Sequence, residues 1–229
     1  MAIQHEVQPG ECISSIAYEY GFFWETIWNH PNNAQLKKTR KDPNILAPGD
    51  LVFIPDKRLK DERRPTEQMH RFRVKSVPAK LRLQLFEGEV PRSNQTYELW
   101  INEKKVTGKT NANGVLTASI PPNATEGDLI IGPHREHYTL LFGYLNPVSD
   151  LSGVQARLNN IGYNCGEADG QMNEDTENAL KAFQARFGLT ETGVVDGPTR
   201  DKLDYLHDHD NLFPNEQSSS GPAKRNVRH

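Results

Sequence analysis

The chain has 229 residues, of which 35% are hydrophobic, and its mean hydropathy is −0.72. Even with its 17 glycines added, the apolar share stays below the roughly 45–50% usual for globular domains, which favours several small domains over one large core. The formal net charge of −3 argues against a general binder of nucleic acid or of an anionic membrane surface. No apolar run approaches the roughly 18 residues that a membrane-spanning helix needs.

Cysteine usage and the N-terminus indicate the compartment. Cys12 and Cys165 are too few and too far apart for a disulfide-stapled scaffold, and the CxxC pairs typical of zinc or redox sites are missing. The first residues, from Met1 to Val7, have neither the basic nor the apolar segment of a Sec signal peptide. We therefore expect synthesis and folding in the cytoplasm without a Sec signal.

Three breaks in composition divide the chain. Residues 57–68 are dense in charge and nearly free of apolar side chains, which predicts a linker. Residues 210–229 are rich in Ser, Pro and Asn, which predicts a disordered tail, more typical of a solvated end than of a docking peptide. At Asn146-Pro147 an alternating pattern gives way to a helical one. We expect a multidomain α+β protein with domains at residues 1–56, 69–145 and 146–209.

The first domain is expected to be small, in the order strand, helix, helix, strand. A strand over residues 3–7 precedes an apolar stripe at helical spacing that ends at Gly21, formed by Ile13, Ile16, Ala17 and Tyr20. A second helical turn is expected over residues 22–28, and a polar stretch over 33–40 also has helical character. Its basic end, residues 37–41, is interpreted as a solvated helix terminus. A turn and a strand close the segment at residues 46–55.

This segment resembles a LysM module. The matching residues are Val7, Pro9, Gly10, Glu11, Ile13, Ile16, Ala17, Tyr20, Gly21, Asp42, Pro43, Asn44, Ile45, Leu46, Pro48, Gly49, Asp50, Val52, Ile54 and Pro55. Two features depart from the family pattern: Cys12 stands where Thr is usual, and the stretch between Trp28 and Asn44 is longer than in a typical copy.

The resemblance implies a shallow groove for an N-acetylglucosamine chain, between the first strand–helix loop and the loop before the last strand. Carried over by position, the glycan-binding residues are Gly10, Glu11, Cys12 and Ile13, facing Asn44, Ile45 and Leu46. Backbone-rich loops can hydrogen-bond acetamido groups while apolar side chains meet the sugar ring. Ile13 and Leu46 can equally be explained as core residues.

The middle domain is expected to be an antiparallel β-sandwich of about seven short strands. Alternation is clear around Leu81–Leu85 and Tyr97–Ile101, polar turns follow at residues 102–105 and 111–114, and further strands are expected at 115–120, 128–131 and 137–141. The string from Gly108 to Gly114 resembles a turn of small Ig-like or carboxypeptidase-regulatory-like domains. Such domains recur in proteins encoded with type VI secretion spikes.

Neither of the two metal-like patterns in this domain predicts a metal site. Asn111-x-Asn113-Gly114 mimics half of an EF-hand loop without its closing acidic residue, so a turn is favoured over calcium. His134 and His137 lack a third ligand at a compatible spacing. We expect no metal and no cofactor.

The last domain is expected to be a three-helix bundle. The apolar positions fall at helical spacing over residues 151–161, 174–187 and 198–206, with Asp150 or Ser149 as the first N-cap and Pro198 opening the third helix. A similar turn precedes the last two helices, Gly166-x-x-Asp169-Gly170 and Gly193-x-x-Asp196-Gly197, which pairs Asp169 with Asp196. The His-rich stretch 207–210 is explained as a helix end.

This pattern resembles the three-helix peptidoglycan-binding domain that accompanies many wall hydrolases. The matching residues are Val154, Gln155, Leu158, Ile161, Gly162, Tyr163, Asp169, Gly170, Thr176, Ala179, Leu180, Phe183, Gln184, Gly188, Leu189, Thr192, Gly193, Val195, Asp196, Thr199 and Leu203. The resemblance implies a ligand loop that includes Asp169 and Gln171. Asp169 and Asp196 are first explained as turn and helix-cap residues. Met172 and Asn173 depart from the pattern, where an aromatic residue and Gly are usual.

The sequence predicts no enzyme. It contains no HExxH, no G-x-S-x-G and no Gly-rich phosphate loop, and the three domains leave no room for a catalytic one. We predict a non-catalytic protein that binds peptidoglycan or another N-acetylglucosamine glycan and is associated with or delivered by a contractile or type VI secretion apparatus. The alternative is an adaptor that loads an effector onto a spike or baseplate, which the departures at Cys12, Met172 and Asn173 favour. Nucleic acid and membrane are not expected partners.

Overall fold

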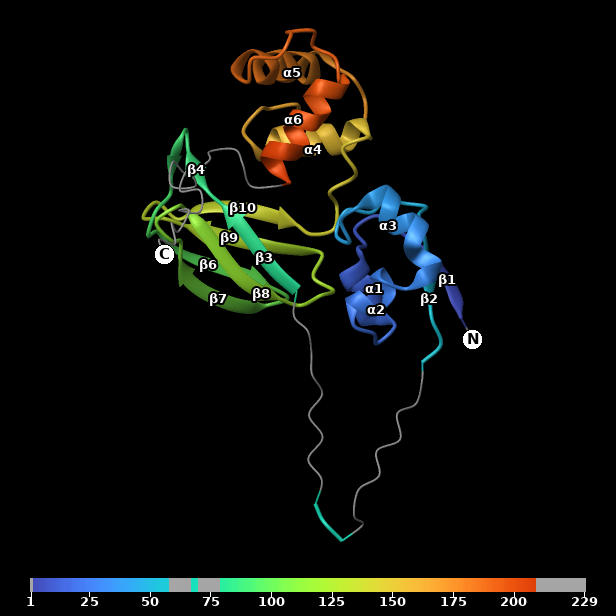
Figure 1. Ribbon diagram of the computed structural model, residues 1–229. Coiled ribbons are helices and arrows are strands. Elements are labelled where there is room, and N and C mark those ends of the chain that lie inside the picture. The colour runs from blue at the N-terminus through green and yellow to red at the C-terminus, as the bar shows by residue number, and fades with distance from the viewer. Residues whose placement is uncertain (1, 58–66, 70–78, 209–229) are drawn as a thin grey trace, which may run out of the picture. The chain divides into compact units, whose positions relative to one another are not determined.

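The computed structural model describes residues 2–57, 67–69 and 79–208 (Figure 1). Most of the predicted linker, the start of the predicted middle domain and the predicted tail therefore lie outside the described residues. The described residues mix helices and strands and divide into two compact units, Met1–Pro147 and Val148–His229. This confirms the expectation of a multidomain α+β protein. Among the described residues, no helix is long and apolar enough to cross a bilayer.

The N-terminal segment has the expected strands and helices, and the polar stretch expected to be helical forms a third helix. It contains β1 (Ile3–Glu6), α1 (Ile13–Glu19), α2 (Trp24–Trp28), the 3-10 turn η1 (Pro31–Asn33), α3 (Ala34–Arg40) and β2 (Leu51–Ile54). The two strands pair antiparallel, with Ile3 opposite Ile54. Helix α1 follows its N-cap Cys12, whose backbone N–H donates to Ser15 Oγ at 2.9 Å, and the chain leaves the helix through Gly21 at φ 67°.

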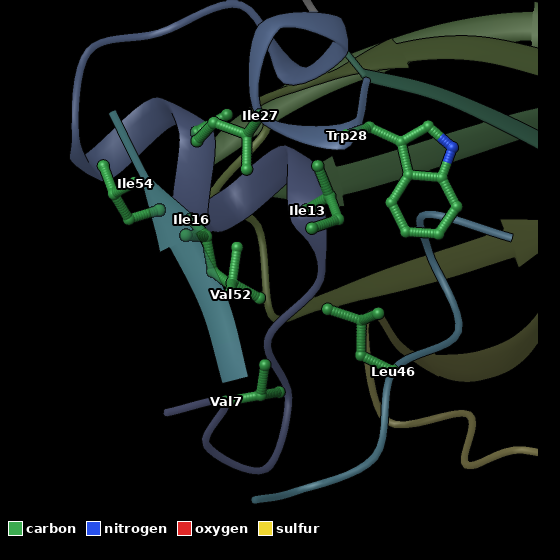
Figure 2. Packing of buried hydrophobic residues seen from close by; sticks show 9 residues of the cluster. Val7, Ile13, Ile16, Ile27, Trp28, Leu46, Val52 and Ile54 are labelled. Atoms are coloured by element: carbon green, nitrogen blue, oxygen red, sulfur yellow. The ribbon is translucent and has the colours of Figure 1, made fainter. Parts of the chain in front are cut away.

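The core of this segment joins both helices to the closing strand. Ile13 and Ile16 of α1 pack with Ile27 and Trp28 of α2 and with Val52 of β2, as Figure 2 shows. The full set of buried apolar residues is Val7, Ile13, Ile16, Ala17, Ile27, Trp28, Leu46, Val52 and Ile54. The helical stripe predicted from the sequence therefore faces the interior.

Polar contacts hold helix α3 in place. The buried Asn33 carboxamide donates to the carbonyl oxygens of Ile27 and Phe53, both at 2.9 Å, and accepts from the Phe53 N–H at 2.7 Å. At the other end of α3, Arg40 forms a two-pronged ion pair with Asp50, at 2.7 and 2.8 Å. The stretch between Trp28 and Asn44 is therefore ordered, and its Asn33 bonds to Phe53 of β2.

The middle segment contains eight described strands. They are β3 (Ala79–Gln84), β4 (Phe86–Glu87), β5 (Val90–Pro91), β6 (Thr96–Ile101), β7 (Lys104–Lys109), β8 (Val115–Ile120), β9 (Glu126–Ile131) and β10 (Glu136–Leu141). One antiparallel sheet has the order β10-β9-β6-β7, while β3 pairs with β8 and β4 with β5. The β6–β7 hairpin turns at Asn102 and Glu103, whose φ angles are 47° and 64°. Leu99 and Leu129 of the four-stranded sheet and Leu116 of the β3–β8 pair belong to one core.

A buried arginine fastens the segment between β5 and β6 to β10. Both terminal nitrogens of Arg92 lie 2.6 Å from the oxygens of Glu136, and the Tyr138 hydroxyl lies 2.9 Å from the same carboxylate. The hydrogen bond from Arg92 lowers the pKa of Glu136. Charge pairing thus closes this end of the sheet.

Three helices form the C-terminal unit around a single core. These are α4 (Leu151–Asn160), α5 (Glu174–Arg186) and α6 (Gly197–His207). The N-cap side chains of α5 and α6, Asn173 and Asp196, accept from the N–H groups of Thr176 and Thr199 at 2.8 and 2.9 Å. The buried apolar residues are Val154, Leu158, Cys165, Ala179, Leu180, Phe183, Leu203 and Leu206.

The end of α6 is tied to α4 through a buried ion pair. Arg157, only 1% exposed, donates to Asp208 through Nη2 at 2.7 Å and through Nε at 3.0 Å, and its Nη1 donates to the Gly153 carbonyl at 2.8 Å. His207 Nδ1 lies 2.6 Å from Asp208 Oδ1. Burial raises the pKa of Asp208, but hydrogen bonds from His207 and Arg157 outweigh it and lower the pKa to about 2, against an ordinary value of 3.8.

Asp208→Asn should therefore destabilise the C-terminal unit by about 3 kcal/mol, because it leaves the buried guanidinium of Arg157 without its counter-charge. Amide hydrogen exchange of α4 and α6 in the full chain measures this loss. Glu177→Gln is the matched control, since it breaks the exposed Glu177–Lys181 pair and should cost less than about 0.5 kcal/mol.

The pair of Arg157 and Asp208 should also make the stability of the C-terminal unit depend on pH in acid. The pKa of Asp208 in the folded protein lies below its ordinary value. The contribution of Asp208 to the free energy of unfolding is therefore complete above about pH 4 and is lost as the pH falls towards about 2. The wild type should lose exchange protection over this window and Asp208→Asn should lack that component. Equal pH profiles for the two proteins would show that the pair does not stabilise the unit.

Candidate functional site

The two N-terminal loops that the resemblance implicates lie together in the structure. The first, residues 10–13, leads from β1 into α1, and the second, residues 44–46, precedes β2. The Ile13 N–H donates to the Pro43 carbonyl oxygen at 2.9 Å, which joins the loops directly. The fold thus brings both predicted sets of residues to one place.

The predicted side chains have different environments in these loops. Ile13 and Leu46 are 0% and 3% exposed and belong to the same core (Figure 2). Glu11 is engaged within the protein, since its Oε2 lies 2.7 Å from His5 Nε2 and accepts from the Gln8 N–H at 2.8 Å. Asn44 is exposed and Ile45 is half-buried.

Backbone groups complete this candidate site. The N–H groups of Gly10 and Leu46 have no hydrogen-bond partner among the residues that the structure describes. Cys12 is half-buried and serves as the N-cap of α1. A ligand bearing amide groups would therefore meet the Gly10 N–H and the Asn44 carboxamide, with Ile45 as the apolar contact, while Leu46 lies in the core.

The first C-terminal loop is held from behind by Gln155 of α4, which is fully buried. Its Nε2 donates to the Gln171 carbonyl at 2.9 Å and to Thr176 Oγ1 at 3.0 Å, and its Oε1 accepts from the Gly170 N–H at 2.8 Å. On the outside, Asp169 Oδ1 accepts from the Gln171 N–H at 2.8 Å. The predicted ligand residues Asp169 and Gln171 are therefore both exposed on an ordered turn.

The second C-terminal loop repeats this arrangement. Gln184 of α5 is also fully buried, and its Nε2 donates to the Val194 carbonyl and to Thr199 Oγ1, both at 3.0 Å. Its Oε1 accepts from the Gly193 N–H at 2.9 Å. Each loop is therefore held by one buried glutamine, which also bonds to a threonine in the first turn of the next helix.

These contacts correct the register of the internal repeat. The sequence pattern pairs Asp169 with Asp196, but the hydrogen bonds match Gly170 with Gly193 and Asn173 with Asp196. Asp196 is a helix N-cap, whereas Asp169 closes a turn before the N-cap. The shared Asp-Gly string misleads because it occupies different positions in the two loops.

The sequence patterns gave no role to three buried amides: Gln155 and Gln184, which support these two loops, and Asn33, which bonds to Ile27 and Phe53 in the N-terminal segment. Gln155 and Gln184 match the family pattern, yet only their full burial identifies them as the supports of the loops. A glutamine on the apolar face of an otherwise amphipathic helix is the available signal. Asn33 carries no such signal, because it lies in a polar stretch.

The residues of the middle segment that resemble metal-binding patterns do not come together as a set of metal ligands. His137 Nε2 lies 3.2 Å from Asp128 Oδ1, and both side chains are half exposed. In the described ranges, no three His, Cys, Asp or Glu side chains are grouped closely enough to hold a metal ion.

Comparison with known proteins identifies the C-terminal unit. Residues 148–203 match the family model described as "Putative peptidoglycan binding domain". Over 72 residues the chain is 35% identical to a spore cortex-lytic enzyme of Oceanobacillus iheyensis, a match that covers 31% of this chain and 26% of that protein. The chain thus matches about a quarter of the length of this curated relative. No solved structure matches the chain. The C-terminal unit therefore carries a peptidoglycan-binding domain, as its resemblance predicts.

Proposed function

We propose that this protein is a non-catalytic binder of peptidoglycan that uses two sites on one chain. The observation that carries the proposal is the match of residues 148–203 to a peptidoglycan-binding family. In the proposal, the C-terminal site is the loop bearing Asp169 and Gln171, and the second site is the pair of N-terminal loops around Gly10 and Asn44.

Rigidity of the C-terminal loop supports its role in binding. Gln155 satisfies the backbone groups of Gly170 and Gln171 from the inside, so the loop has a defined shape without a ligand. Binding to such a loop loses little conformational entropy, which favours affinity. The exposed side chains of Asp169 and Gln171 are then free to hydrogen-bond polar groups of the wall polymer.

The N-terminal loops suit N-acetylglucosamine. An acetamido group has one donor and one acceptor, which complement the Asn44 carboxamide and the free N–H group of Gly10. Glu11 acts indirectly in the proposal, because its contacts with His5 and Gln8 fix the first loop. Ile13 and Leu46 support the loops from the core.

Four carboxyl groups have lowered pKa values, and each lowering has a local cause in the fold. A glycosidase needs a carboxyl group whose pKa is raised so that it can act as a general acid. The carboxyl groups of the described residues whose pKa shifts are all lowered, each through a neighbouring donor: Glu98, Glu136, Asp196 and Asp208. These four carboxyl groups therefore suit a structural role better than that of a general acid, in agreement with the proposal.

We further propose that the protein works with a contractile or type VI secretion apparatus. This part rests on the resemblance of the middle segment. An adaptor role is the second candidate, and Met172 favours it, since this flexible apolar side chain is 48% exposed on the C-terminal loop. Cys12 and Asn173 no longer favour it, because each is the N-cap of a helix.

Gln171→Ala should weaken pelleting of the full chain with purified sacculi about fivefold, since one good polar contact is worth about 1 kcal/mol. The measurement is a pelleting isotherm. Val194→Ala is the matched control, because Val194 occupies the equivalent position in the second loop and is 53% exposed. A protein that ignores sacculi but co-purifies with a spike or effector protein would favour the adaptor.

The double variant Asn44→Ala, Ile45→Ala should weaken binding of soluble chitin oligomers about tenfold, because an amide contact and an apolar contact are lost together. Isothermal titration calorimetry measures the effect. In sacculus pelleting, the loss should add to that of Gln171→Ala, apart from coupling through avidity. Unchanged titration curves would exclude these loops as the glycan site.

The intact protein should release no soluble muropeptides from purified sacculi. Chromatography of the supernatant after long incubation measures this, with a known muralytic enzyme as the positive control. Release that a single carboxylate substitution abolishes would contradict the non-catalytic part of the proposal.

A further inference from the structure

An aromatic side chain lies against the first N-terminal loop within the unit Met1–Pro147. It belongs to Tyr144, which follows β10. A Cβ atom added to Gly10 would lie 2.8 Å from Cζ of Tyr144 and 3.0 Å from its hydroxyl oxygen, so the ring packs on the bare Cα of Gly10. A residue far along the chain thus adjoins the loop that carries the free Gly10 N–H.

Two glycines make this approach feasible. Gly10 and Gly143 have φ angles of +86° and +80°, in the region that favours glycine. A Cβ added to Gly143 would overlap the carbonyl oxygen of Gly10. At Gly143 the contact is therefore a close backbone-to-backbone approach that a larger residue would prevent, whereas at Gly10 a larger residue would meet the Tyr144 ring.

The ring of Tyr144 remains available to a ligand. It is 47% exposed, and its hydroxyl has no hydrogen-bond partner among the described residues. Tyrosine combines an apolar face with a polar tip, which suits a sugar ring whose faces are apolar and whose edge carries hydroxyl groups. In contrast, the hydroxyl of Tyr138 on β10 is hydrogen-bonded to Arg92 and Glu136.

We propose that Tyr144 is part of the glycan site, where its ring packs against an N-acetylglucosamine residue and its hydroxyl bonds the sugar edge. This inference rests on the proposed function of the N-terminal loops and extends it. In this inference, residues of the LysM-like segment and of the end of the β-rich segment form the site together. The isolated LysM-like segment would then lack one wall of the site.

The test is calorimetric titration of the full chain with chitohexaose. Tyr144→Ala should raise the Kd about tenfold, and Tyr144→Phe, which keeps the ring, about twofold. Gly143→Ala should weaken binding as well, because its methyl group displaces the segment from Gly10. Tyr18→Ala is the matched control and should bind as the wild type does, since Tyr18 is 54% exposed on α1.

A second measurement does not depend on the variants. In a titration of the wild type followed by NMR, the amide signals of Gly10 and Tyr144 should shift together, while that of Tyr18 stays in place. Tyr144→Ala with wild-type affinity, while the variant at Asn44 and Ile45 is weakened, would overturn this inference and leave the proposed site intact. Failure of the wild type to bind chitohexaose would overturn both.

Discussion

The loops of this protein depend on buried carboxamides. Asn33, Gln155 and Gln184 are 1%, 0% and 0% exposed, and each pairs with backbone N–H and C=O groups at once, as a neighbouring strand would. An amide is suited to this because it carries both donors and an acceptor. Leaving such groups unpaired in the interior costs about 1–3 kcal/mol each, a large share of the stability of a small domain. The apolar cores hold the helices together, but these amides determine where the loops lie.

Most helices and long strands could be predicted because their apolar spacing reports which face is buried. Ile13 and Ile16 face the N-terminal core, Leu180 and Phe183 face the C-terminal core, and the polar break after Ile101 is the expected hairpin. Short elements carry no such signal. Strands β4 and β5 have two residues each, too few for a period. Helix α3 was predicted only as a polar stretch of helical character, because it has no buried residue to mark an apolar face.

The candidate site could be predicted less well, and the reason is physical. Local patterns report residues that cap helices or turns, which is why Asp169 and Asp196 were correctly explained as turn and cap residues. They do not report contacts between distant segments. The pairing of Gln155 with Gly170 spans a loop, and the contact of Tyr144 with Gly10 spans the entire β-rich segment, so only the folded chain places them together.

Two ordered sites on one chain have a consequence for wall binding under the proposed function. Peptidoglycan repeats its chemistry along a polymer, so a protein held by one site keeps the other at a high effective concentration of ligand. Linked weak sites can gain about 10²–10⁴-fold in apparent affinity this way, without any new contact. The gain requires each site to be shaped before binding, because a loop that orders on contact loses part of its binding energy to entropy. The carboxamide-supported C-terminal loop and the N-terminal loops bridged from Ile13 to Pro43 both meet that condition.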